Sequence, residues 1–123
     1  MILAKIDNDG KERWTIVEGD QLYALEGDLF GNFSKGASAG TLSGSRLLAP
    51  AEAETIICCG LNYMDTVRQM KVEVPEEPAL FFKPLSALVN PGEDACSLPI
   101  ASDTRYEAEL CAVMKREAWR VSE

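Results

Sequence analysis

The start of the chain alternates apolar and polar residues in short runs, a pattern typical of half-buried strands. Residues 2–6 are apolar except for Lys5, and residues 14–17 and 21–25 are rich in β-branched, aromatic or aliphatic residues. Turn signals separate these runs at residues 8–10 (Asn-Asp-Gly) and 19–20 (Gly-Asp). The pattern therefore predicts an antiparallel meander of three strands.

Residues 36–44 are dominated by Gly, Ser and Ala. Small residues of this kind do not build a core, so we expect a flexible connector here. It falls within a small N-terminal β domain that we place at residues 1–50. Three strands cover an apolar face poorly on their own, so we expect this domain to pack on the second half of the chain.

A different pattern occupies the second domain, which we place at residues 54–123. Residues 55–60 and 79–82 are short apolar runs, and each pattern predicts a buried strand. Between them, Asn62 is placed to cap a short helix over residues 63–70. The elements together predict a mostly β protein of the α+β class.

Residues 106–114 matter most for chemistry, because a helix and a strand would place their two glutamates differently. In a strand, Glu107 and Glu109 share one face, with Cα atoms about 6.5–7 Å apart. In a helix they would lie roughly 200° apart around the axis. Apolar residues at nearly every second position favour the strand, and Pro91-Gly92 predicts a turn before it.

Composition removes several classes of function. The net charge is −8 without a basic stripe, so a nucleic-acid partner is not expected. Histidine is absent, which excludes imidazole acid–base chemistry and His–metal sites from this chain. We see neither a leader peptide nor the roughly 20 apolar residues of a membrane span, so we expect no membrane partner and a cytoplasmic location.

Three features suggest chemistry, and each has a plainer alternative. Glu107 and Glu109 offer the oxygen ligands that Mg²⁺ prefers, or they are simply acids on a solvent-facing strand. Asn62 and Tyr63 follow a strand and open a helix, where backbone N–H groups often meet ligands, or they form a routine turn. Lys83 suits an anionic substrate, or it is an ordinary lysine at a strand end.

Taken in order, five segments resemble the fumarylacetoacetate hydrolase family. They are Gly60-Leu61-Asn62-Tyr63, Pro75-Glu76-Glu77-Pro78, Phe82-Lys83-Pro84 with Ser86-Ala87-Leu88, Pro91-Gly92, and Tyr106-Glu107-Ala108-Glu109-Leu110. Residues 1–50 are also similar to the small domain that precedes the catalytic domain in bacterial members. The resemblance therefore covers nearly the whole chain.

This resemblance implies that residues 54–123 are the N-terminal part of a mixed β-roll catalytic domain, usually dimeric. Family members bind Mg²⁺ or Mn²⁺ through two Glu of such a motif and an Asp further along, and the metal polarises a 2-oxo or 2-hydroxy acid. Their reactions include C–C bond hydrolysis, dienedioate isomerisation, and oxaloacetate decarboxylation or tautomerisation. By the same resemblance, Glu107 and Glu109 are metal ligands, whereas Asn62, Tyr63 and Lys83 bind substrate.

Two departures from the family pattern keep a second function open. Many members carry a His and then a Glu where this chain has Thr66 and Gln69, neither of which is a general base near neutral pH. We therefore assign no catalytic residue. The third metal ligand is also missing, so we expect a truncated catalytic domain. The chain is then either a metal-dependent enzyme of this family that is active once the rest of the domain is provided, or a truncated, inactive member or a subunit that needs a partner chain. In either case we expect a homo-oligomer or a partner chain.

Overall fold

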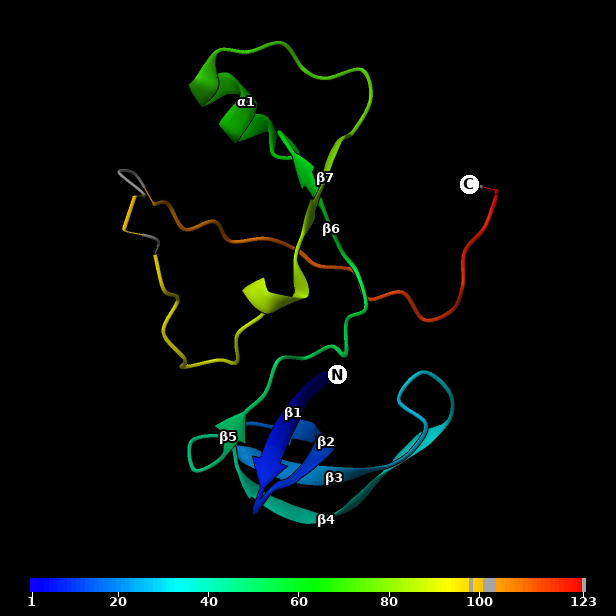
Figure 1. The fold of residues 1–123 in the computed structure, drawn as a ribbon. Coiled ribbons are helices and arrows are strands. Elements are labelled where there is room, and N and C mark those ends of the chain that lie inside the picture. The colour runs from blue at the N-terminus through cyan, green and yellow to red at the C-terminus, as the bar shows by residue number, and fades with distance from the viewer. Residues whose placement is uncertain (98, 101–103, 123) are drawn as a thin grey trace. The chain divides into compact units, whose positions relative to one another are not determined.

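The computed structural model describes residues 1–97, 99–100 and 104–122 (Figure 1). Its strands pair antiparallel throughout the described residues, and helix is scarce. The predicted fold class, mostly β, is therefore confirmed. The chain divides into two compact units. The first unit is Met1–Ala51 together with Asn90–Glu123, and the second unit is Glu52–Val89.

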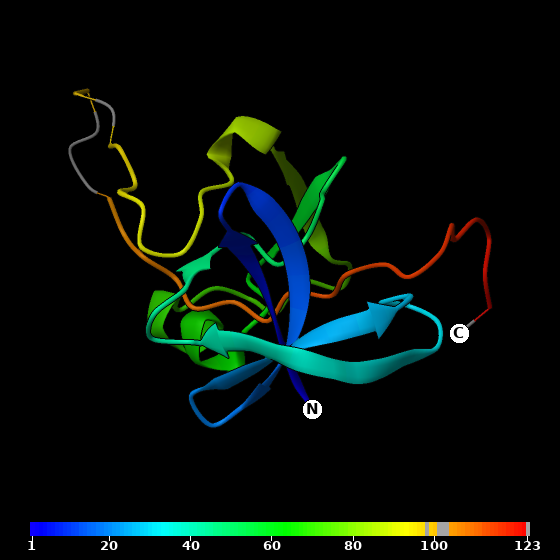
Figure 2. The same ribbon diagram turned by 90° about the horizontal axis from the view of Figure 1, so that it is seen from below.

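A five-stranded sheet with the order β4-β3-β2-β1-β5 forms the body of the first unit. Its strands are β1 (Ile2–Asn8), β2 (Lys11–Glu18), β3 (Gln21–Gly27), β4 (Phe33–Thr41) and β5 (Arg46–Leu47). Figure 2 shows β1 to β4 running back and forth as a twisted meander. The three strands expected from the sequence are confirmed, and each runs further than its pattern indicated.

Two-residue loops connect the first three strands. Asp9 and Gly10 have φ values of 54° and 79°, the positive pair that a type I′ turn requires. Gly10 N–H also donates a hydrogen bond of 2.8 Å to Asp7 Oδ1. The next loop begins with Gly19, whose φ of 62° is typical of the first position in a type II′ turn. Both turn predictions are therefore confirmed.

Strand β4 corrects the expectation of a flexible connector at residues 36–44. Strand β4, which includes residues 36–41, pairs with β3 from Gln21↔Thr41 to Gly27↔Phe33. The register is irregular between Leu22 and Leu25. The small residues tolerate that irregularity, and Gly40 takes a φ of 112° that a larger residue would resist. Composition misled because a neighbouring strand supplies the hydrogen bonds that order this segment.

The core of the first unit draws on both faces of its sheet. Ile6, Thr15 and Leu22 are essentially fully buried, and the pairings Ile6↔Arg13 and Val17↔Leu22 place all three on one face, whereas Ile16 is buried on the other. Thr15 is satisfied there because its hydroxyl donates a hydrogen bond of 2.9 Å to the Ala4 carbonyl. Lys5 is also buried and forms a 2.6 Å ion pair with Glu12, which offsets the cost of removing its charge from water.

A two-stranded sheet and a short helix make up the second unit. Its elements are β6 (Ile56–Gly60), α1 (Met64–Met70), β7 (Ala79–Lys83) and the 3-10 turn η1 (Leu85–Ala87). The expected strands exist, but the prediction that they are buried is wrong. All five residues of β7 are exposed, and Val67 of α1 is the one buried side chain in this fully described unit. An isolated pair of strands lacks the neighbours that would cover its faces.

The predicted strand over residues 106–114 is also wrong. The described residues 104–114 form neither helix nor strand, and their side chains are exposed. Alternating apolar residues specify which face a strand would bury, but a strand also needs a partner that exchanges backbone hydrogen bonds. The turn at Pro91-Gly92 is confirmed, because Glu93 N–H donates to the Asn90 carbonyl at 3.1 Å and Gly92 has a φ of 84°.

Candidate functional site

A shallow hollow of about 320 Å³ lies in the second unit, where β6 ends and β7 begins. Its volume is at the small end of the range for ligand pockets. Eleven residues line it: Cys59, Gly60, Leu61, Asn62, Met64, Val74, Pro75, Glu76, Glu77, Pro78 and Ala79. The hollow therefore joins two of the segments that carry the family resemblance, residues 60–63 and 75–78.

The ends of α1 position both walls of this hollow. Leu61 has a φ of 55°, which turns the chain sharply after β6, and Tyr63 is the helix N-cap with an extended backbone. At the other end Lys71 adopts a left-handed conformation and donates to Arg68 O, while Val72 N–H donates to Val67 O. This closure resembles a Schellman motif and sends the chain back toward β7.

The sequence-based prediction for the start of α1 is wrong by one residue. The pattern places Asn62 as the cap of a helix over residues 63–70, but the helix begins at Met64 and Tyr63 is its N-cap, without a side-chain cap hydrogen bond. Asn62 instead directly precedes the cap and lines the hollow. The sharp turn at Leu61 displaces the helix start, which pattern matching to Asn as a cap does not detect.

The hollow is acidic. Glu76 and Glu77 line it, no basic side chain does, and Asn62 is its single amide. A carboxylate ligand would therefore meet two negative charges there and would need compensation from backbone N–H groups or a bound cation. Glu76 and Glu77 are not among the site residues that the sequence predicts. Their position between two prolines, which hold the segment extended, was the available signal.

Other residues expected in the pocket do not line the hollow. Lys83 lies opposite Ile56 at the far end of the β6–β7 ladder, whereas Ala79 lies opposite Gly60 at the hollow. Lys83 is four positions after Ala79 along the strand, a distance of about 13 Å at strand spacing. Tyr63 and the helix positions Thr66 and Gln69 are likewise absent from the lining. Asn62 is thus the one predicted substrate-binding residue that the hollow includes.

Glu107 and Glu109 lie in the exposed segment after residue 103, within the first unit. Their oxygens are the right donors for Mg²⁺ or Mn²⁺, but two carboxylates are only part of a ligand shell. No group of three potential metal ligands of the His, Cys, Asp or Glu type converges anywhere in the described residues. The two carboxylates are therefore of the right chemical type for such a metal, but the described residues do not provide enough ligands for a complete site.

Comparison with known proteins identifies the class of this chain. Residues 55–123, more than half of its length, match the family model described as fumarylacetoacetate (FAA) hydrolase C-terminal. Residues 1–50 match the model described as Rv2993c-like, N-terminal. The chain belongs to the fumarylacetoacetate hydrolase family.

Three relatives illustrate the match. A fumarylacetoacetate hydrolase domain-containing protein 2 homolog of Dictyostelium discoideum is 39% identical over 63% of this chain and 26% of its own length. Protein Rv2993c of Mycobacterium tuberculosis is 36% identical over 61% of this chain and 28% of its own. The mitochondrial oxaloacetate tautomerase FAHD1 of Bos taurus is 37% identical over 57% of this chain and 32% of its own length.

The matched part is only 26–33% of the length of the first relatives. No solved structure shows a significant match to the chain. Among the described residues, no helix has the length and apolarity needed to cross a bilayer.

Proposed function

We propose that this chain belongs to a divalent-metal-dependent enzyme that acts on small 2-oxo or 2-hydroxy acids. The observation that carries the proposal is the family match over residues 55–123, together with relatives named as oxaloacetate tautomerases. Oxaloacetate tautomerisation or decarboxylation is preferred over C–C bond hydrolysis, since Thr66 and Gln69 provide no general base for activating water. The proposed division is an N-terminal β domain at 1–50 and a catalytic part at 54–123.

Each predicted site residue has a role in this proposal. Glu107 and Glu109 would supply carboxylate ligands to Mg²⁺ or Mn²⁺, with further ligands from other residues, water or substrate. When bound, such a metal acts as a Lewis acid on the substrate oxygens. Asn62 at the hollow would donate a hydrogen bond to a substrate oxygen, and Tyr63 and Lys83 would complete substrate binding.

Metal titration by calorimetry tests the ligand assignment. The chain should bind Mn²⁺ or Mg²⁺, and the double variant Glu107→Ala/Glu109→Ala should bind more than about tenfold more weakly, since even outer-shell partners of metal ligands contribute roughly 10–100-fold. The control Asp94→Ala/Glu117→Ala removes the same charge from exposed positions. Equal loss in both double variants would show that only net charge attracts the metal and would reject the assignment.

The alternative is an inactive family member, or a subunit that requires a partner chain or a second copy. Thr66 and Gln69 in place of the usual acid–base pair favour it, as does the incomplete donor set among the described residues. Turnover separates the two proposals. The absorbance of enol oxaloacetate, followed with Mn²⁺ present, should decay faster than in buffer when the chain is supplied with the segment that carries the third metal ligand, if the enzyme proposal holds. An unchanged decay, with metal binding intact, supports the inactive alternative.

A further inference from the structure

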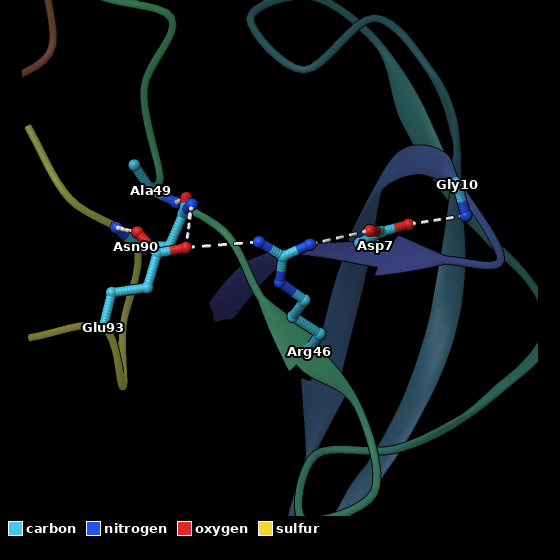
Figure 3. Close-up of polar contacts among 6 residues, drawn as sticks. All are labelled: Asp7, Gly10, Arg46, Ala49, Asn90 and Glu93. Atoms are coloured by element: carbon cyan, nitrogen blue, oxygen red, sulfur yellow. Dashed lines mark hydrogen bonds and ion pairs between the residues drawn. The ribbon is translucent and has the colours of Figure 1, made fainter.

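A connected cluster of polar residues surrounds Arg46 in the first unit (Figure 3). Arg46 belongs to β5 and lies opposite Asp7 of β1. Its guanidinium donates to Asp7 Oδ2 at 3.3 Å and to Glu93 Oε1 at 3.2 Å. Arg46 therefore joins the edge of the sheet to the turn at residues 90–93, and none of these residues takes part in the proposed metal or substrate site.

The turn itself is held by the Glu93 carboxylate. Asn90 donates to that carboxylate twice, from its backbone N–H to Oε2 at 3.0 Å and from Nδ2 to Oε1 at 2.8 Å. These two hydrogen bonds and the one from Arg46 lower the pKa of Glu93 below its usual value, so the group stays charged at neutral pH. The carboxylate thus fixes the orientation of the Asn90 side chain.

Asn90 transmits this order to a second stretch of chain. Its Oδ1 accepts a hydrogen bond of 2.9 Å from Ala49 N–H. The chain leaves the first unit after Ala51 and re-enters it at Asn90. The points of exit and entry are therefore hydrogen-bonded to each other. Strand β5, which leads to the exit, has only two residues and gives little support of its own.

We propose that the turn at residues 90–93 is a latch. It holds together the two segments by which the chain leaves the first unit, at residues 46–51, and re-enters it at Asn90; we call these two segments the neck. The charged Glu93 carboxylate holds Asn90, and Asn90 holds Ala49, so that the entering and leaving segments stay side by side. Breaking the latch would open the neck locally, because closing the long intervening loop costs entropy that these hydrogen bonds offset. The proposal goes beyond the proposed function, since it requires neither metal nor substrate.

Hydrogen exchange measured by mass spectrometry on the whole chain tests the latch. In Asn90→Ala, the amides of residues 46–51 should exchange about tenfold faster, since the Ala49 N–H loses its acceptor. In Glu93→Gln, which keeps the shape but removes the charge, the increase should be about two- to fivefold. Asp94→Asn is the matched control, because it removes one charge from the adjacent exposed position.

Residues 12–18 of β2 serve as the internal reference. Faster exchange confined to residues 46–51 and 88–97, with β2 and the control unchanged, supports the latch. Three results would overturn it: native exchange rates in Asn90→Ala, equal acceleration in Glu93→Gln and Asp94→Asn, or acceleration that spreads equally to β2. The last result would mean that the turn supports the whole unit rather than its neck.

Discussion

The two units bury their side chains to very different extents. In the first unit, Ile6 and Leu22 are 1% and 0% exposed, whereas Phe82 and Leu80 of β7 in the second are 72% and 64% exposed. Yet β7 (Ala-Leu-Phe-Phe-Lys) is more apolar than β1 and β3, the strands that carry Ile6 and Leu22. The inner strands of the five-stranded sheet each have two neighbours, while β6 and β7 have one each. Neighbouring strands, rather than the hydrophobicity of a segment, therefore decide what is buried.

Truncating a leucine in each unit is the strongest way to break this comparison. Leu22→Ala should lower the free energy of unfolding by about 2–5 kcal/mol, because it removes a fully buried side chain and leaves a cavity. Leu80→Ala should change it by less than about 0.5 kcal/mol, because that side chain is already in water. Urea denaturation followed by circular dichroism measures both. Similar losses would show that β7 is covered in solution.

Threonine substitutions give a smaller effect and test polar burial. Thr15→Val keeps the size of the side chain but removes the hydrogen bond from the hydroxyl to the Ala4 carbonyl, so the loss should be about 1 kcal/mol. Thr55→Val, at an exposed position beside β6, is the control and should stay within about 0.5 kcal/mol of the native chain. If Thr15→Val were as stable as the native chain, the hydrogen bond would contribute no net stability.

The smallest effect concerns Lys35 of β4. Its Nζ donates to both carboxylate oxygens of Glu18, at 3.0 and 2.9 Å, and lies 4.0 Å from the centre of the Tyr23 ring. The hydrogen bond to Glu18 raises the pKa of Lys35 above its usual 10.5. A raised pKa means that the folded state favours the charged form, so the contribution is complete below pH 10.5 and is lost as the pH rises through the folded-state pKa.

Lys35→Met should therefore lower the urea midpoint slightly at about pH 8, and the difference from the native chain should shrink above pH 10.5. Lys115→Met, in the exposed segment after residue 103, should show no such pH-dependent difference. A difference for Lys35→Met that stays constant with pH would mean that packing on Tyr23, and not the charge, stabilises β4.

Local chemistry explains what could be predicted of the fold. The turns at Asp9-Gly10, Gly19 and Pro91-Gly92 were predictable because each needs a backbone conformation that few residues adopt. Strand β4 was not, because its order comes from hydrogen bonds to β3 and not from its own small residues. The strand expected at residues 106–114 failed for the converse reason: its pattern is suitable, but the described residues pair no strand with it.

In the candidate site, too, local features could be predicted from the sequence, whereas features that depend on distant parts of the chain could not. The order of the motifs predicts Asn62 as a substrate-binding residue; Asn62 lines the hollow, and its role in binding stays a prediction. The acidic wall formed by Glu76 and Glu77 was not predicted, because it depends on how Lys71 reverses the chain after α1. The distance of Lys83 from the hollow was also hidden, since it follows from the antiparallel register of β6 and β7.

The irregular register of β4 has a consequence for how the protein behaves at high concentration. As the outer strand of its sheet, β4 presents backbone groups that a strand from another molecule could extend. The register shifts against β3 bend and twist such an edge, and the charge of Lys35 adds a cost to covering it. Growth of fibres from this edge is therefore disfavoured. We expect that molecules in concentrated solutions do not aggregate by strand pairing at β4.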